Sequence, residues 1–334
     1  MKTRITELLG TQYPIMQGGM HFVGMAPLAA AVSQAGGLGV ITALTQKTPE
    51  LLAREIRQAR ERTDKPLGVN LTFLPTFAKP PYEEYLRAAH EGGIRIIETA
   101  GRNPEAFLPG MKQLGMTVIH KCTSVRHALK AQAIGCDAVS VDGFECGGHP
   151  GEDDVPGLIL LPRAADELTV PFLASGGMAD GRSLVAALAL GADGINMGTR
   201  FIATQEAPVH ERVKQAVVAA SELDTRLIMR QLRNTERVLN NEGVRRIAEI
   251  EKGMGADLKI DDILEQVAGV YPKVMIHGDM DSGAWSCGMV AGLIRDVPTV
   301  RELIDRIVRQ AREIASRRLQ PMLGVLHEPE RLQA

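Results

Sequence analysis

Residues 170–198 read VPFLASGGMADGRSLVAALALGADGINMG and contain two strand-like runs on either side of one helix-like run. The runs at 170–177 and 193–198 are short and apolar, whereas the alanine-rich run at 181–191 repeats apolar residues every three or four positions. Strands that are apolar on both faces are typical of a parallel sheet covered by helices on both sides. This stretch therefore predicts two consecutive parallel strands joined by a covering helix.

The same alternation extends from Pro14 to Phe201. Helix-like runs with the same apolar spacing, several of them ending in glycine, separate eight strand-like runs. The strand candidates are residues 14–19, 38–43, 66–73, 94–101, 116–122, 137–143, 170–177 and 193–198. Eight such units favour an α/β fold of the closed (β/α)8 type, a TIM barrel, over an open doubly wound sheet. No strand candidate is followed by a G-x-G-x-x-G turn, so a Rossmann dinucleotide site has no support.

The pattern changes after Phe201. Residues 206–280 read as helices with no strand between them, which predicts a helical subdomain inserted after the eighth strand. Residues 300–323 read as one long amphipathic helix, which we expect to return and pack against the barrel. We expect the insert and the loop at 73–85 to shape a second substrate site.

The composition excludes several other classes of protein. The chain has 334 residues, 45% hydrophobic and 23% charged, and a formal net charge of -2, which argues against nucleic acid or an anionic membrane as the main partner. No apolar run reaches the roughly 18 residues of a membrane-spanning helix, and the N-terminus lacks the pattern of a signal peptide. The four scattered cysteines suit reduced thiols and a cytoplasmic location.

The active site of a barrel lies where the C-terminal ends of the strands converge. Paired glycines after the seventh strand and a Gly-Thr pair after the eighth expose backbone N–H groups, which predicts a phosphate site, although glycines here could also only permit tight turns. The strand-end candidates are Gln17, Gly18, Gly19 and Met20; Asn70 and Thr72; residues 98–101; Lys121 and Cys122; Asp142; Ser175, Gly176 and Gly177; and Gly198 and Thr199.

Lys121 ends an apolar strand at this predicted catalytic face. A lysine there could neutralise an anionic cofactor or act as a Schiff-base nucleophile. The alternative is a lysine that only extends its amine to the rim of the barrel.

The stretch GFECGGHPGEDD, residues 143–154, places one histidine in a glycine-rich hinge after the sixth strand. Three interpretations of His149 remain open: a solvated loop residue, a metal ligand, or a side chain held over a cofactor or substrate. We prefer the third, because the glycines Gly147 and Gly148 let the backbone approach a ligand closely. The metal interpretation would add ligands from Cys146, Glu152, Asp153 and Asp154.

In this order, these motifs resemble those of the FMN-dependent nitronate monooxygenase family, formerly called 2-nitropropane dioxygenases. The matching stretches include PIMQGGM, GVNLTFLPT, ETAG, VIHKCTSVRHALKA, ASGGMADGRSLVAALALGADGINMGTRF, IMRQLRNT and GDMDSGAWSCGMVAGLI. Within the family, GFECGGHPGEDD and HKCTSVRHALKA are most similar to the bacterial NADH:quinone reductase branch. Related branches are enoyl-acyl-carrier-protein reductases and dehydrogenases of steroid-ring CoA thioesters.

The resemblance implies a role for each motif. Catalytic roles fall to His149, which would face the substrate side of the flavin, and Lys121, which would stabilise the reduced flavin. The remaining residues would bind FMN, with no metal: Gln17, Gly18, Gly19 and Met20 at the ring; Asn70, Lys121, Asp142 and Gly148 near its polar edge; Ser175, Gly176, Gly177, Gly198 and Thr199 at the phosphate. The FMN-binding barrel would comprise residues 1–205 and 286–334, and the helical substrate-site subdomain residues 206–285.

The function that the resemblance implies is an FMN-dependent NADH:quinone reductase that works by a ping-pong mechanism, with NADH as co-substrate. The alternative is a monooxygenase that oxidises alkyl nitronates with oxygen, and a third activity is oxidoreduction of enoyl or steroid-ring thioesters. A flavin-binding module without turnover is the non-enzymatic alternative. The expected partners are small molecules, namely NADH and a quinone or nitronate. Neither nucleic-acid binding nor membrane insertion is expected, and a homodimer is compatible with the sequence.

Overall fold

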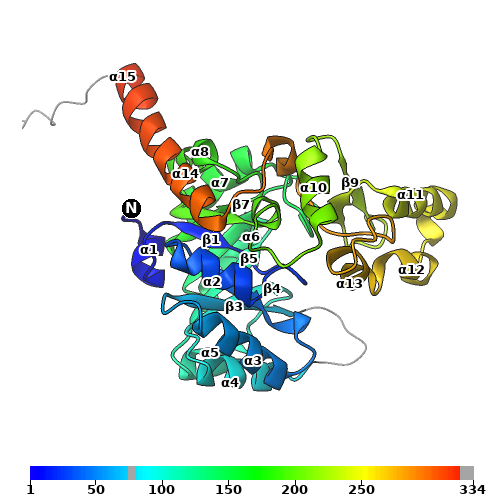
Figure 1. Ribbon diagram of the computed structural model, residues 1–334, viewed down its shortest axis with the longest axis horizontal. Helices are drawn as coiled ribbons and strands as arrows, with labels where there is room; N and C mark the ends of the chain where they lie inside the picture. The colour runs from blue at the N-terminus through cyan, green and yellow to red at the C-terminus, as the bar shows by residue number, and fades with distance from the viewer. Residues whose placement is uncertain (74–79, 324–334) are drawn as a thin grey trace, which may run out of the picture.

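The computed structural model describes residues 1–73 and 80–323, and eight parallel strands form its centre (Figure 1). The strand order is β1-β8-β7-β6-β5-β4-β3-β2. The strands are β1 (Ile15–Gln17), β2 (Gly39–Thr42), β3 (Leu67–Phe73), β4 (Ile96–Gly101), β5 (Thr117–Cys122), β6 (Ala138–Asp142), β7 (Phe172–Ser175) and β8 (Gly194–Met197).

The sheet closes on itself between β1 and β2. A parallel bridge joins Met16 to Leu38. The Gln17 N–H donates to the Leu38 carbonyl, and the Leu38 N–H donates to the Ile15 carbonyl, both over 2.9 Å. The prediction of a (β/α)8 barrel is therefore confirmed, and each predicted strand overlaps an observed one.

Helices cover the outside of the barrel between successive strands (Figure 1). Their starts follow the sequence, since Thr48 and Ser124 accept hydrogen bonds from the first turns of α3 and α6, and Asp180 forms a capping box at α8. The covering helices are α2 (Ala26–Gln34), α3 (Pro49–Arg60), α4 (Tyr82–Glu91), α5 (Leu108–Gln113), α6 (Val125–Ala133), α7 (Gly157–Glu167), α8 (Gly181–Ala189) and the short α9 (Thr199–Ile202).

The inside of the barrel is apolar at one end and polar at the other. Helix α1 (Arg4–Leu9) closes the N-terminal end, where Ile5 and Leu9 pack onto inward-facing strand residues. These are Met16, Leu38, Val40, Ile96, Ile119, Ala138 and Leu173. Because side chains alternate along a strand, the next inward positions on β4 and β5 are Glu98 and Lys121. The polar residues therefore form a separate layer above a sealed apolar base.

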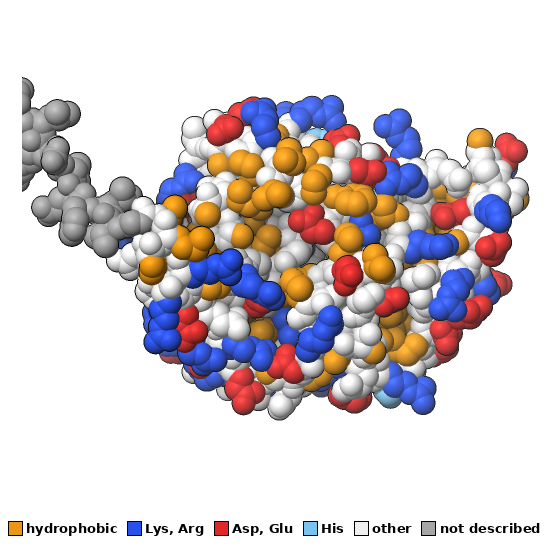
Figure 2. Space-filling model, turned by 90° about the horizontal axis from the view of Figure 1, so that it is seen from above, with side chains coloured by type: hydrophobic (Ala, Val, Ile, Leu, Met, Phe, Trp, Pro, Cys, Tyr) orange, Lys and Arg blue, Asp and Glu red, His pale blue; other side chains and the backbone are white. Residues whose placement is uncertain are grey.

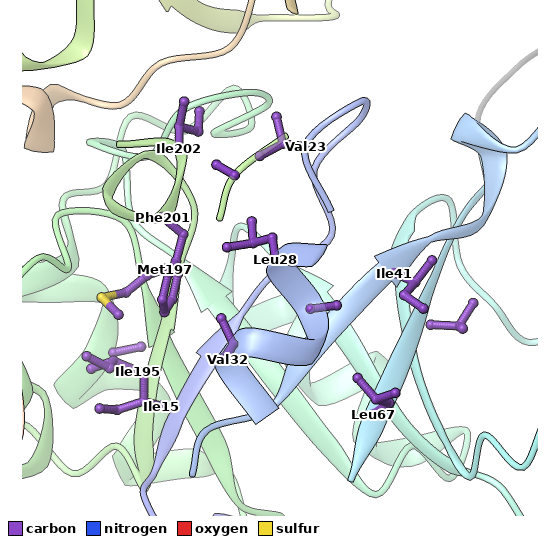
Figure 3. Close-up of a cluster of buried hydrophobic side chains, with 14 of the residues drawn as sticks. Ile15, Val23, Leu28, Val32, Ile41, Leu67, Ile195, Met197, Phe201 and Ile202 are labelled. Atoms are coloured by element: carbon purple, nitrogen blue, oxygen red, sulfur yellow. The ribbon is translucent and has the colours of Figure 1, made fainter. Parts of the chain in front are cut away.

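A second apolar layer fills the space between the barrel wall and its helices. Figure 3 shows Leu28 and Val32 of α2 beside Ile15 of β1, with Phe201 of α9 nearby. All four side chains have almost no exposed surface. Burying one such side chain stabilises the fold by roughly 1.5–3 kcal/mol, so this layer fixes the helices to the strands.

The segment after α9 differs from its sequence-based prediction. It contains α10 (Glu211–Ala219), α11 (Glu242–Met254), α12 (Leu264–Val267) and α13 (Val270–Met275), but also an antiparallel hairpin of β9 (Thr225–Ile228) and β10 (Glu236–Leu239). The prediction of helices with no strand between them was therefore wrong. The hairpin depends on distant partners, since Arg237 pairs with Gly148 and Val238 with Ser286, and no local pattern reports these contacts.

The insert is only partly independent of the barrel. A small apolar cluster of its own contains Ile228, Val238 and Val244, which come from β9, β10 and α11. In contrast, Val213 of α10 and Val274 of α13 belong to the main core. Figure 1 shows α11 and α12 farthest from the barrel. The division at residues 206–285 stays a prediction.

Helix α14 (Val300–Glu313) packs between α8 and α2, and so covers the part of the barrel where the four-residue α9 is too short to do so alone. Its six buried residues lie along one apolar stripe, and Gln310 accepts a hydrogen bond from the Gly181 N–H over 3.2 Å. The helix continues through π-helical turns (Ile314–Leu319) into α15 (Gln320–Leu323). The expected return to the barrel is confirmed for α14, whereas α15 has no buried residue.

The surface carries charges of both signs. Figure 2 shows hydrophobic side chains gathered in the middle of one face, with Lys, Arg, Asp and Glu interspersed around them. Leu158 and Ile159, at the start of α7, are 69% and 56% exposed. The described helices include none that is both long and apolar enough to cross a membrane. All four cysteines are buried free thiols.

Candidate active site

A cavity of about 1010 Å³ lies at the C-terminal ends of the strands. Ligand sites commonly occupy roughly 300–1,000 Å³, so this cavity has room for a cofactor and a second ligand. Thirteen of the fourteen predicted site residues line it. They are Gly18, Gly19, Met20, Asn70, Lys121, Asp142, Gly148, His149, Ser175, Gly176, Gly177, Gly198 and Thr199.

Gln17 is the exception. Its side chain is fully buried outside the cavity, where Nε2 donates to the Val40 carbonyl over 3.2 Å and Oε1 accepts from the Val40 N–H over 3.1 Å. Its neighbours Met16 and Gly18 face the inside of the barrel. Because side chains alternate along a strand, the Gln17 side chain faces outward. The structure therefore uses Gln17 to join β1 to β2.

The floor of the cavity is organised around Glu98, which has no exposed surface. Its Oε2 accepts hydrogen bonds from Asn70 Nδ2 over 2.7 Å and from the Gly19 N–H over 2.8 Å. Its Oε1 accepts from Asn196 Nδ2 over 3.2 Å and lies 3.4 Å from Lys121 Nζ. Buried carboxylates need such partners, because an unpaired buried charge is strongly unfavourable. Glu98 therefore holds groups from four other strands or their ends.

Lys121 carries a charge that its surroundings stabilise. Burial alone would lower the pKa of Lys121, but the carboxylates of Glu98 and Asp142 outweigh it and raise that pKa. Burial raises the pKa of Asp142, and the charge of Lys121 opposes this rise. A protonated amine is a poor nucleophile. This geometry favours Lys121 as a fixed positive charge over Lys121 as a Schiff-base nucleophile.

The glycine loops after β7 and β8 offer unpaired backbone donors to the cavity. Gly176 and Gly177 have φ of +84° and +73°, which side-chain-bearing residues rarely adopt. Across residues 1–73 and 80–323, the N–H groups of Gly176, Gly177, Gly198 and Thr199 have no hydrogen-bond acceptor. Backbone N–H groups that converge on open space form an anion site. The loops therefore fit a phosphate group.

The hinge that carries His149 is held by the inserted hairpin. Gly148, at φ +83°, donates its N–H to the Arg237 carbonyl over 3.0 Å and accepts from the Arg237 N–H over 2.6 Å. The buried Arg237 guanidinium also donates to the Phe144 carbonyl from Nη2 over 3.0 Å and lies 4.6 Å from the centre of the Phe144 ring. His149 itself is exposed to the cavity. The hinge is thus fixed immediately before His149, whose side chain is exposed.

The acids that follow His149 bind the insert. Glu152 accepts hydrogen bonds from the Thr235 N–H over 3.0 Å and from Thr235 Oγ1 over 2.6 Å. Asp154 forms an ion pair with Arg230 over 2.9 Å. Over the part of the chain that the structure describes, no group of three His, Cys, Asp or Glu side chains could hold a metal ion. The contacts of these acids therefore do not favour the metal interpretation of His149.

Several residues of the cavity were missed by the sequence-based prediction. Glu98 was named only among the strand-end candidates at 98–101 and was given no role, although an acidic residue inside an otherwise apolar strand signals a functional or structural pairing. Tyr271, Ser286 and Gly288 come from the insert and the segment after it, where no local pattern places them at the barrel. Gly288 donates its N–H to Thr199 Oγ1 over 2.9 Å and so adjoins the phosphate loops.

A cluster of exposed basic residues forms one edge of the cavity. This basic rim consists of Arg102 after β4 and Arg126, His127 and Lys130 on α6. Within the described residues, Arg102 and Arg126 have no carboxylate within ion-pair distance, whereas Lys130 pairs with Glu105 over 3.1 Å. The rim follows strands that lie across the barrel from β8. Of the predicted loop at 73–85, residues 74–79 lie outside the described chain.

Comparison with known proteins identifies the family. The family model for nitronate monooxygenase matches residues 2–310. The chain is 32% identical to a (3aS,4S,5R,7aS)-5-hydroxy-7a-methyl-1-oxo-octahydro-1H-indene-4-carboxyl-CoA dehydrogenase of Rhodococcus jostii, over 93% of this chain and 96% of the relative. It is 31% identical to a probable nitronate monooxygenase of Staphylococcus aureus, over 75% of this chain and 81% of the relative.

A solved structure extends this likeness to three dimensions. FabK from Thermotoga maritima is 34% identical and superposes with a TM-score of 0.88, over 95% of this chain and 98% of FabK. The residues that the family model matches, 2–310, contain the barrel strands, the glycine loops and the histidine hinge. The chain therefore belongs to the nitronate monooxygenase family, whose members are oxidoreductases.

Proposed function

We propose that the protein is an FMN-dependent NADH:quinone reductase that works by a ping-pong mechanism. The observation that carries the proposal is the basic rim across the barrel from the phosphate loops. A cofactor phosphate at the loops leaves the rim to a second ligand that carries negative charge. The phosphates of NADH fit this requirement, because arginine binds phosphate through paired N–H donors.

The residues present fit FMN. The free N–H groups of Gly176, Gly177, Gly198 and Thr199 would hold its phosphate. The protonated Lys121, beside Glu98, supplies a positive charge on the cavity floor. Bound there, FMN would supply two-electron redox chemistry, and the fixed charge of Lys121 would stabilise added negative charge on its ring.

The size of the cavity supports a shared site for both substrates. One volume contains the phosphate loops, the basic rim and His149. NADH and quinone would therefore occupy the same space in turn, an arrangement that is compatible with a ping-pong mechanism. His149, exposed on a hinge fixed by Gly148, can orient either substrate or donate a proton to the quinone.

A CoA-thioester dehydrogenase is the second candidate. The basic rim would bind the phosphates of CoA as well as those of NADH, and the relative from Rhodococcus jostii is a carboxyl-CoA dehydrogenase at 32% identity. A small alkyl nitronate, the substrate of a monooxygenase, needs neither the rim nor a cavity of about 1010 Å³. The rim therefore favours both phosphate-bearing substrates over a nitronate.

Anaerobic stopped-flow spectroscopy tests the proposal. The FMN-loaded protein is mixed with NADH, NADPH, an alkyl nitronate or a CoA thioester, and flavin bleaching is followed. The proposal expects rapid bleaching by NADH and reoxidation by a quinone. Replacing Arg126 by alanine should raise the NADH concentration needed for half-maximal bleaching without changing reoxidation. Bleaching by the thioester or the nitronate, with none by NADH, would transfer the function to that class of substrate.

A further inference from the structure

Three hydrogen-bonded side chains line the cavity beside the histidine hinge. Tyr271 of α13, Ser286 of the segment after the insert, and Glu236 of β10 come from separate parts of the chain. Ser286 Oγ donates to Glu236 Oε1 over 2.7 Å and lies 2.6 Å from the Tyr271 hydroxyl. The Ser286 N–H donates to the same tyrosine oxygen over 3.2 Å. We call these three residues the tyrosine relay.

Counting protons fixes the direction of the relay. An ionised carboxylate can only accept, so the single hydroxyl proton of Ser286 goes to Glu236. The hydrogen bond between Ser286 and Tyr271 must then use the tyrosine proton. Burial, reinforced by the charge of Glu236, raises the pKa of Tyr271 and keeps its hydroxyl protonated. The Tyr271 hydroxyl therefore has no proton left to donate to a ligand, but its oxygen, which already accepts from the Ser286 N–H, can accept a second hydrogen bond from a ligand.

The relay lies where a substrate would sit. A Cβ atom on Gly148, the residue before His149, would lie 3.6 Å from Ser286 Oγ. The Tyr271 ring meets the His21 ring edge to face with centroids 5.2 Å apart, and His21 lines the cavity after β1. Tyr271 thus spans the space between the first strand loop and the histidine hinge.

We propose that Tyr271 contacts the substrate and accepts a hydrogen bond from a hydroxyl group of the ligand, with Ser286 and Glu236 as positioning residues that set this polarity. The inference deepens the proposed function and rests on it, because it assumes that the substrate binds in this cavity. The ligand class is a ring or chain that bears an O–H group, such as the hydroquinone formed from a quinone. A tyrosine free to donate would instead prefer the carbonyl oxygen of the oxidised form.

The test uses the FMN-loaded full-length protein and two matched probes. Hydroquinone offers two O–H donors, and 1,4-dimethoxybenzene has the same ring without them. Equilibrium dissociation constants are measured anaerobically from the change in flavin absorption, which requires no turnover. The wild-type protein should bind hydroquinone more tightly than the ether. Tyr271→Phe should reduce this preference about 3- to 10-fold, as expected for one hydrogen bond.

Glu236→Gln tests whether the direction of the hydrogen bonds in the tyrosine relay, and not only the packing of Tyr271, sets the preference for hydroquinone. The glutamine amide can donate to Ser286 Oγ, so the Ser286 hydroxyl can then donate to Tyr271 instead of accepting from it. The Tyr271 proton becomes available to the ligand, and the preference for hydroquinone should fall although Tyr271 remains. Tyr85→Phe is the matched control, because Tyr85 donates to the Gln46 carbonyl over 2.7 Å and does not line the cavity. It should leave the preference unchanged.

Equal binding of the two probes by the wild-type protein, or an unchanged preference in Tyr271→Phe, overturns the inference. If Tyr271→Phe does not fold, an unchanged preference in Glu236→Gln overturns it. Failure of the proposed function gives a different result, namely no bleaching by NADH while the probe preference and its loss in the variants persist.

Discussion

Replacing Glu98 by glutamine tests whether the cavity floor depends on a single buried carboxylate. The wild-type Oε2 accepts from both Gly19 and Asn70, and a glutamine oxygen can keep these two bonds. The new amide group must then face the Asn196 amide and the Lys121 amine, which are both donors. The change therefore removes a counter-ion of Lys121 and places the glutamine amide against two other hydrogen-bond donors, Asn196 Nδ2 and Lys121 Nζ.

The expected loss of stability follows from the burial of this pair. Removing one partner of a buried ion pair costs about 3–5 kcal/mol, because the remaining charge is left without compensation. The Lys121 side chain is 22% exposed, and Asp142 still favours its charged form. We therefore expect a loss of about 3 kcal/mol, at the lower end of this range. The pKa of Lys121 should fall at the same time, because Asp142 is then the only one of the two carboxylates that opposes the lowering of this pKa by burial.

Urea unfolding of the FMN-free protein measures this loss, provided that the slope with denaturant is unchanged. Glu242→Gln is the matched control: it removes an exposed carboxylate that pairs with Arg245 over 2.8 Å. Such surface pairs contribute about 0.5 kcal/mol or less. A Glu98→Gln protein that unfolds within about 1 kcal/mol of the wild type would refute the reasoning that Glu98 holds the floor together.

Four further predictions test other parts of the site. His149→Ala should retain FMN but lower NADH:quinone turnover roughly 10²–10⁴-fold; loss of FMN would instead make the histidine structural. Lys121→Met should lower the flavin reduction potential and the FMN content of the purified protein, and unchanged values would remove its proposed role. Gly177→Ala and Gly115→Ala both strain a backbone of positive φ, +73° and +65°, yet only the first should weaken FMN binding, as measured by fluorescence titration. Burial and the charge of a neighbouring histidine lower the pKa of His120 from 6.5 to about 4, so its contribution to stability is complete above pH 6.5 and is lost as pH falls toward 4. In urea unfolding, His120→Gln should therefore lose about 1 kcal/mol less than the wild type between pH 7.5 and pH 5.5, and parallel profiles would contradict this.

The barrel was predictable because its signals are local. Each strand carries its own apolar run, and each covering helix its own three-and-four spacing, so residues 14–201 could be divided without knowledge of distant contacts. Lys121 and Ser175 were found at the cavity because they end strands on the inward phase. Gln17 was assigned to the flavin ring, although one position along the strand reverses the direction of the side chain.

The remainder was not predictable from local patterns. The hairpin at 225–239 mixes charged and apolar residues that suit a helix, and its strands form through contacts with Gly148 and Ser286. Tyr271 carries no motif, and Ser286 lies in the matching stretch at 278–294 without a pattern that assigns it to the site. The two residues become neighbours only when α13 docks beside the segment that follows the insert. Pairings between distant segments decide these positions, and sequence periodicity does not encode such pairings.

The contacts of Gly288 have a consequence for the order in which the protein is made. Gly288 hydrogen-bonds to Thr199, and Met289 donates its N–H to the Glu145 carbonyl over 3.1 Å. A chain emerging from the ribosome can assemble the barrel strands long before residue 288 is synthesised, but the phosphate loops and histidine hinge lack this support until then. Binding of the proposed cofactor would therefore be a late event in biosynthesis, because a chain that stops before this segment lacks both these contacts and the covering helix α14.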